Sequence, residues 1–398
     1  MSQKAASTVL KVMLIWLLGL FGILVFRNVL PGIDFINQDI ESGFFVGGFL
    51  GGMFICLVTI LVLVVNREPK EQNNAKKSYA AVGMILAVFG LFMMSLSACY
   101  DPIMVKVFGS SIQTENWYTW VKSFLITDVF CLLVVMAVAS MSEKTPIEKH
   151  KMTVGQFICA IFMNAGIIGI GAIIGAIVEF SIAFNFGIAG GGQTISDMLI
   201  ESNDFWRILT VGIGAPIVEE LIFRKFLIDR VHKYGEGIAI FVSGFLFGLF
   251  HGNFSQFFFA TGVGLFFAFI YVRTGRVWYS ILLHMVVNMS TSVISINLIE
   301  MMDLEKMEEY MVMDLASSEA TQMALELLPS MLLFLGWVLF LVICTIVGWI
   351  LWIVKRKKLF LKKSEEYVEK KKFCTAFCNF GMIIFLILCV VRFMSFYI

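Results

Sequence analysis

Long uninterrupted apolar stretches dominate the 398-residue chain. A helix needs roughly 20 apolar residues to cross ~30 Å of bilayer hydrocarbon. Such stretches lie at 9–30, 43–65, 78–100, 119–140, 155–185, 205–232, 237–252, 254–272, 277–298, 329–353 and 373–397, of which 237–252 is short. They lack the alternation of a lipid-facing strand, so helices are preferred to a barrel. The pattern predicts an all-α, polytopic integral membrane protein with about eleven transmembrane helices.

The composition agrees with this class. Hydrophobic residues make up 59% of the chain and charged residues 15%, against about 25% charged in soluble domains. These values exclude a soluble enzyme, a disordered scaffold and a collagen-like fibre. The net charge of +1 gives no reason to expect a nucleic-acid partner. Most of the eight cysteines lie in or beside apolar stretches, where they act as small hydrophobic residues and not as a disulfide framework.

Basic residues gather in alternate connections between the predicted helices. If the N-terminus is cytoplasmic, the basic segments 66–77, 144–151 and 355–372 all fall on the cytoplasmic side, and the acidic segment 299–328 falls outside. The positive-inside rule therefore favours an N-in, C-out orientation.

Two of these polar segments allow a closer interpretation. For 299–328, a plain solvated connector is the preferred interpretation, and an amphipathic helix on the outer surface is the alternative. The basic segment 355–372 is interpreted as a topogenic anchor that touches anionic lipid.

Polar and ionisable residues gather in the otherwise apolar region 216–288, although a charge costs ~2.5–3.5 kcal/mol at the centre of a membrane helix. The sequence reads PIVEELIFRKF, then FGLFHGNFSQ, then LLHMVVN. The residues concerned are Glu219, Glu220, Arg224, His251, His284 and Asn288. Counted from the predicted helix ends, all three motifs lie at a similar depth in the membrane, which permits one buried site.

Spacing pairs some of these residues. Arg224 follows Glu220 by four positions, so the two share a helix face and can form an ion pair. Glu219 then lies on a different face, roughly 100° round the helix.

The remaining residues are suited to hydrolysis. Glu219 could take a proton from water while His251 holds that water, and His284 and Asn288 could donate hydrogen bonds to an oxyanion. Two alternatives stay open. Glu219, His251 and His284 could ligate zinc, although no HExxH helix is present, or the polar residues could only join helices by hydrogen bonds.

Together the three motifs resemble those of the CAAX protease and bacteriocin-processing (CPBP) family, which is related to the type II CAAX prenyl endopeptidases. The family pattern is EExxxR, then FxxxH, then HxxxN or a near variant, on successive core helices. Here the motifs begin at Glu219, Phe247 and His284, and the resemblance covers about 205–298. Lys225 departs from the pattern, since a glycine often follows the arginine.

The resemblance implies an intramembrane endopeptidase with a catalytic core of four helices. Carried over residue by residue, Glu219 is the general base with His251 beside it, and His284 and Asn288 form the oxyanion site. It implies a glutamate-activated water without a cofactor, with zinc as the alternative. The implied partners are the lipid bilayer and a membrane-embedded peptide or lipidated protein as substrate, in a bacterial plasma membrane.

The chain is predicted to contain about five helices of unassigned role in 1–200, the protease-like core at 205–298, an acidic extracytoplasmic loop at 299–328 and two helices in 329–398. Two rival functions are a non-catalytic bacteriocin-immunity membrane protein and a peptide transporter. A helix break at Gly212, Gly214 and Pro216 would suit either a transporter or a protease.

Overall fold

The computed structural model describes residues 74–136 except 116, 131 and 134, and then residues 143–187, 199, 202–314, 317–359, 361 and 372–397. Every regular element in this part of the chain is a helix. The all-α prediction is therefore confirmed for the described residues. The predicted helices at 9–30 and 43–65 lie outside them.

Six helical stretches of the described residues are long and apolar enough to cross a membrane. They are Asn74–Phe108 (α3), Val154–Asn185, Phe254–Thr274 (α12), Val277–Glu300, Ser318–Lys358 and Phe380–Tyr397 (α18). The apolar helix α11 (Glu236–Phe250) is shorter, as the sequence predicts for 237–252. These helices confirm a multi-pass helical membrane protein, whereas the number eleven and the N-in, C-out orientation stay predictions.

The chain divides into two compact units. Unit 1 contains the described residues within Met1–Ile147, Leu221–Ser243 and Lys362–Arg392, and unit 2 those within Glu148–Glu220, Gly244–Leu361 and Phe393–Ile398. Five of the six predicted site residues therefore belong to unit 2, and Arg224 belongs to unit 1.

Within unit 1, α3 packs against α17 (Lys372–Phe377), and Gly83 of α3 meets the start of α18 at Gly381 and Met382. The contact is close because Gly83 and Gly381 have no side chains: a Cβ at Gly83 would clash with the backbone of Met382. The hydroxyls of Ser78 and Tyr234 also form a hydrogen bond of 3.0 Å.

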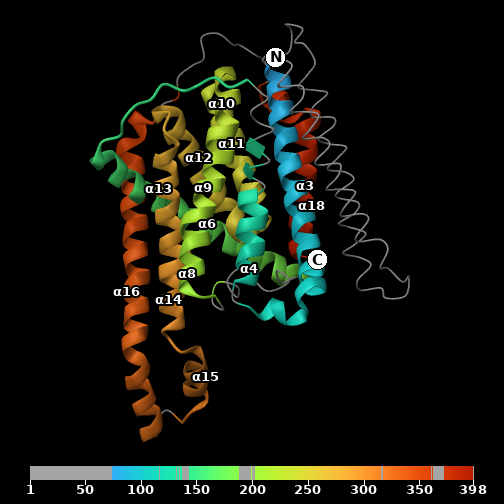
Figure 1. Cartoon of the computed structure of the whole chain (residues 1–398). Helices are drawn as coiled ribbons and strands as arrows, with labels where there is room; N and C mark the ends of the chain where they lie inside the picture. The colour runs from blue at the N-terminus through green and yellow to red at the C-terminus, as the bar shows by residue number, and fades with distance from the viewer. Residues whose placement is uncertain are drawn as a thin grey trace. The chain divides into compact units, whose positions relative to one another are not determined.

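Within unit 2, α6 (Val154–Phe186) packs against both α12 and α16 (Ser318–Lys355), all labelled in Figure 1. Small residues allow the backbones to approach, as is common between membrane helices. Gly171 faces the backbone of Phe259 on α12, and Gly166 faces Gly348 on α16. Since lipid is as apolar as these side chains, close packing of this kind provides much of the attraction between the helices.

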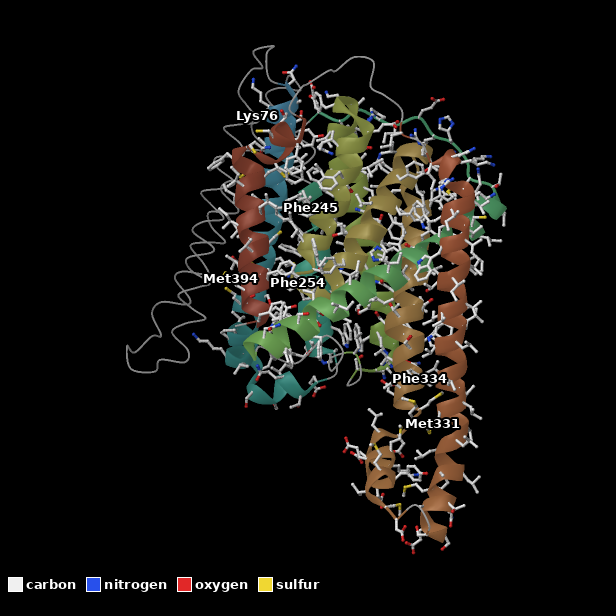
Figure 2. The ribbon with its side chains drawn as sticks, turned by 180° about the vertical axis from the view of Figure 1, so that it is seen from behind. Lys76, Phe245, Phe254, Met331, Phe334 and Met394 are labelled. Carbon is white, nitrogen blue, oxygen red and sulfur yellow. The ribbon has the colours of Figure 1, made fainter. Side chains whose placement is uncertain are left out.

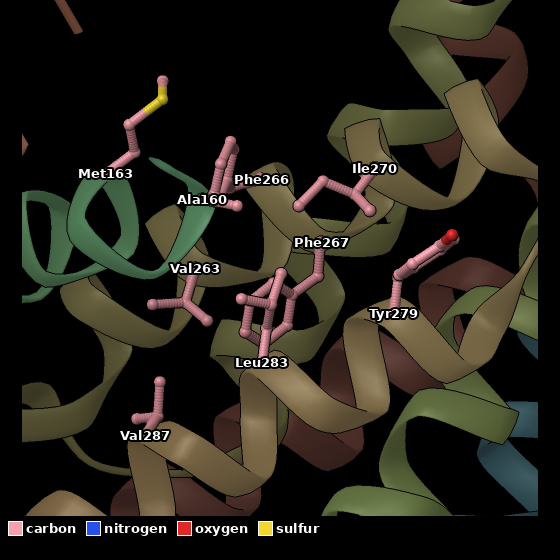
Figure 3. Packing of buried hydrophobic residues seen from close by; sticks show 9 residues of the cluster. All are labelled: Ala160, Met163, Val263, Phe266, Phe267, Ile270, Tyr279, Leu283 and Val287. Atoms are coloured by element: carbon pink, nitrogen blue, oxygen red, sulfur yellow. The ribbon is translucent and has the colours of Figure 1, made fainter. Parts of the chain in front are cut away.

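A cluster of buried apolar side chains joins α6, α12 and α13 (Val277–Asn288) and is seen from close by in Figure 3. Its members are Ala160, Met163, Val263, Phe266, Phe267, Ile270, Tyr279, Leu283 and Val287. At its edge the hydroxyl of Tyr279 accepts a hydrogen bond of 2.8 Å from the backbone N–H of Met152. This packing fixes the position of α13, which carries two of the predicted site residues.

Parts of the segment 299–328 are helical, where a plain connector is the preferred prediction. It contains α15 (Leu304–Val312), and α16 begins at Ser318, eleven residues before the predicted start of its helix at 329. Both helices have side-chain caps: Asp303 accepts from the N–H of Lys306, and Ser317 accepts from the N–H of Ala320. The connector interpretation is wrong in this respect, because the caps and the apolar positions between the charges favour helices.

Candidate active site

Glu219 and Glu220 end the short helix α9 (Ala215–Glu220), which lies between two π-helical segments, η5 (Ile208–Gly214) and η6 (Leu221–Phe226). The whole stretch from 204 to 234 is helical. At Gly212 and Gly214, where a break is predicted, the chain forms the wider π-helix η5, and Pro216 lies in α9. π-Helical segments are rare and occur often at functional sites, because they change which way the following side chains point.

The imidazole of His284 lies next to both carboxylates. Its Nδ1 is 3.2 Å from Oε1 of Glu220, and its Nε2 is 3.7 Å from Oε2 of Glu219. Glu220 is fully buried, whereas the side chain of Glu219 is 21% exposed. Two neighbouring carboxylates thus differ in access, although both contact the same ring. The predicted proximity of Glu219 and His284 is present in the structure.

His251 follows the last residue of α11, and its ring orientation is fixed by the helix. Its Nδ1 lies 2.9 Å from the carbonyl oxygen of Phe247, one turn earlier. Since a carbonyl only accepts, Nδ1 carries the proton and Nε2 keeps its lone pair in the neutral ring. Gly252, with φ of 73°, turns the chain from this histidine into α12.

Phe247 contacts both histidines of the site. Its ring centroid is 4.9 Å from that of His251 and 5.7 Å from that of His284, each in an edge-on arrangement. The ring centroid of Phe267 also lies 5.7 Å from that of His284. In the sequence Phe247 appears only as the first letter of FxxxH, and its placement between the two rings explains that spacing.

Asn288 is hydrogen-bonded to the helix that carries the two glutamates. Its Nδ2 donates to the carbonyl oxygen of Val211 at 2.9 Å. In η5 the N–H of Ala215 donates to the carbonyl of Thr210, so the carbonyl of Val211 would next pair with position 216. Pro216 has no N–H, and the amide of Asn288 supplies the missing donor. In the predicted oxyanion role, Asn288 would therefore donate through the second N–H of its side-chain amide.

Arg224 is fully buried in unit 1. Its guanidinium donates to Oγ of Ser243 at 3.0 Å, and that hydroxyl donates to the carbonyl of Phe223 at 2.7 Å. The ion pair predicted between Glu220 and Arg224 stays a prediction.

The start of α12, directly after His251, is held by two residues that the motifs do not include. Oε1 of Glu179 accepts hydrogen bonds from the N–H of Ser255 at 3.1 Å and from the hydroxyl of Tyr397 at 2.9 Å. That hydroxyl in turn accepts from the N–H of Phe254 at 2.9 Å. Both N–H groups belong to the first turn of the helix, where they have no partner within it. Glu179 is the single acidic residue of the predicted helix 155–185, a signal that could have marked it in the sequence.

No group of three or more His, Cys, Asp and Glu side chains in the described part of the chain is spaced to hold a metal ion. Zinc held by Glu219, His251 and His284 therefore stays an alternative prediction. The site thus combines the partly exposed carboxylate of Glu219, the imidazole of His284 next to it and the amide donor of Asn288.

Comparison with known proteins identifies relatives of this region. Residues 201–290 match the family described as type II CAAX prenyl endopeptidase Rce1-like. A protein of Bacillus subtilis (strain 168), described as "Putative membrane peptidase YdiL", is 31% identical over 168 residues, which cover 39% of this chain and 64% of the relative. The matched region thus spans less than two thirds of that relative. No solved structure matches the chain. Residues 201–290 are thus similar to type II CAAX prenyl endopeptidases and to a membrane peptidase, in agreement with the resemblance that the sequence motifs give.

Proposed function

We propose that this chain is an intramembrane endopeptidase that hydrolyses a peptide bond of a membrane-associated or lipidated peptide through a water activated by Glu219. The observation that carries the proposal is the placement of the His284 ring beside two carboxylates of different access. The similarity to a prenyl endopeptidase family and to a membrane peptidase supports the same reaction class.

Glu219 is the base in this proposal because its carboxylate is the one that a water molecule can reach. The carboxylate takes a proton as the water oxygen attacks the carbonyl carbon of the scissile bond. The same proton then passes to the leaving amine when the tetrahedral intermediate collapses. Glu220, fully buried, accepts from Nδ1 of His284 and holds that ring in place.

The oxyanion of the intermediate needs donors that are already in place. Nε2 of His284, when protonated, and the second N–H of Asn288 are the donors that we assign to it. We assign the orientation of the attacking water to His251, whose ring is held by the contact of its Nδ1 with the carbonyl of Phe247. The substrate is a membrane-embedded peptide or a lipidated chain, the protein acts in a bacterial plasma membrane, and the reaction needs no metal.

The experiment compares membrane peptides by mass spectrometry from cells that express the wild type or Glu219→Gln at matched levels. The substitution keeps the size of the side chain and removes the base, so turnover falls by about 10²–10⁴-fold. New peptide C-termini should appear with the wild type and be lost with the variant.

Glu143→Gln is the matched control, because the same chemical change is made at an exposed glutamate outside the site. It should give the wild-type peptides. Equal cleavage by Glu219→Gln would refute the role of this residue. No difference between folded proteins would instead favour the immunity or transport functions.

A further inference from the structure

Helix α16 is longer than the membrane is thick. Its 38 residues rise about 57 Å, whereas the hydrocarbon layer is ~30 Å. The basic residues Lys355–Lys358 mark one edge of the membrane. A span of roughly 20 residues counted back from them ends near residue 335. By this count we expect the first part of the helix, residues 318–333, to extend beyond the hydrocarbon on the other side, so that the span begins a few residues later than the predicted 329.

Helix α15 lies beside this part of α16. Nζ of Lys306 on α15 is 3.6 Å from Oε2 of Glu326 on α16. Figure 1 shows α15 and the start of α16 beyond the end of α14 (Ser295–Glu300), and Figure 2 labels Met331 and Phe334 close to that end. We refer to residues 301–333 as the acidic hairpin.

The acidic hairpin carries a strong negative charge. It has one basic residue, Lys306, and seven acidic residues, which leave a net charge of −6 (seven negative, one positive). The acidic residues are Asp303, Glu305, Glu308, Glu309, Asp314, Glu319 and Glu326. The rest of the chain is balanced or basic, since the whole has a net charge of +1. The excess negative charge of the sequence is therefore concentrated in the hairpin.

The acidic hairpin also exposes large apolar side chains. Met311 is 80% exposed, Val312 85% and Leu325 64%. Outside the hydrocarbon such groups face water, and large exposed apolar surfaces there are typical of binding sites. The hairpin contains seven of the 23 methionines of the chain. Methionine is flexible and polarizable, so it suits a surface that adapts to a helical peptide.

We propose that the acidic hairpin binds a cationic amphipathic peptide helix. Such a peptide presents Lys and Arg to the seven carboxylates and an apolar face to the exposed Met, Val and Leu side chains. A second copy of the chain would bring like charges together, six net negative charges on each side. An anionic bilayer surface would repel the hairpin for the same reason. This binding does not depend on the proposed protease activity.

The test uses the full chain in nanodiscs of zwitterionic lipid and a fluorescent 18-residue peptide of Lys and Leu arranged as an amphipathic helix (roughly five helical turns). Fluorescence anisotropy measures its Kd. The triple variant Glu305→Lys, Glu308→Lys, Glu309→Lys should weaken binding by at least about tenfold at low salt, and added salt should reduce the difference. The double variant Met311→Ser, Val312→Ser should weaken it by roughly tenfold through lost apolar contact.

The matched control reverses three exposed carboxylates elsewhere, Glu115, Glu143 and Glu148, to lysine. It should keep the wild-type Kd within about twofold, because none of these residues lies in the hairpin. Equal loss in the control, or equal binding of a peptide of the same charge with its leucines scattered, would overturn the proposal. A shift from dimer to monomer in the hairpin variants, measured by mass photometry, would assign the surface to a second copy instead.

Discussion

At the scale of single residues, the site depends on placing chemically identical groups in different surroundings. Glu219 and Glu220 are neighbours in sequence, yet one side chain is 21% exposed and the other fully buried. The cause is the helix itself, which turns successive residues by about 100°. The sequence predicts this difference in face, and it also predicts that His284 comes near the pair.

Two contacts of the site could not be predicted from the sequence. The hydrogen bond from Asn288 to the carbonyl of Val211 could not be predicted, since it depends on a π-helical register and on the missing N–H of Pro216. Phe247 also gains its position between two histidines only through the packing of α11 and α13. Both contacts join segments far apart in sequence, and local spacing carries no information about them.

Metal content tests the chemistry assigned to these residues. We expect purified protein to contain well under one equivalent of zinc, because a carboxylate and neighbouring imidazoles act on water directly in the proposed mechanism. Elemental analysis of the protein in detergent measures this, with His284→Ala as the comparison. Stoichiometric zinc that is lost in His284→Ala would contradict the mechanism.

At the scale of elements, two devices position the site: close helix packing at glycines and the anchored start of α12. The sequence predicts helices α6, α11, α12 and α13 from their apolar stretches. It does not predict their partners. In the sequence, Gly171 and Gly175 look like other glycines of membrane helices. The structure shows that α12 packs against both of them.

Gly171→Ala should destabilise the protein by about 1–3 kcal/mol, because the added methyl group would overlap the backbone of Phe259 on α12. Gly155→Ala is the matched control on the same helix, since nothing lies within 4 Å of a Cβ at that position. Its stability should change by less than about 1 kcal/mol. Thermal unfolding in detergent compares the two, and equal midpoints would contradict the packing described for α6.

Glu179 should act as a positioning residue for the turn that carries His251. Glu179→Leu removes the acceptor for Ser255 and Tyr397, so the rate of cleavage should fall by roughly tenfold as the turn shifts. Glu179→Gln keeps an acceptor oxygen and should stay within about twofold of the wild type. The rate at which new C-termini appear in membranes measures both variants. Equal loss in the two variants would mean that charge, and not the hydrogen bonds, matters at this position.

At the scale of the whole molecule, the described residues form two compact units, and five of the six site residues belong to one of them. The all-α class follows from hydropathy alone, since only helices satisfy the backbone in lipid over such stretches. The extent of α16 does not follow from hydropathy, because its first turns are polar and depend on the cap at Ser317.

The orientation of the chain is a prediction at this scale. In a background without native cysteines, a cysteine at Asp314 should react with a membrane-impermeant maleimide in intact cells, because the acidic hairpin is predicted to lie outside. A cysteine at Lys357 should react only after permeabilisation, since the basic segment is predicted to be cytoplasmic. The reverse pattern would contradict the N-in, C-out orientation.

The most direct test of the central claim follows the water molecule itself. Membranes with the wild type, Glu219→Gln or Glu143→Gln are incubated in heavy-oxygen water, and peptide C-termini formed during the incubation are measured by mass spectrometry. Hydrolysis places one heavy oxygen atom in each new carboxyl group. We expect labelled C-termini with the wild type and Glu143→Gln, and at least about 10²-fold fewer with Glu219→Gln. Labelled C-termini at wild-type levels with Glu219→Gln would contradict the account.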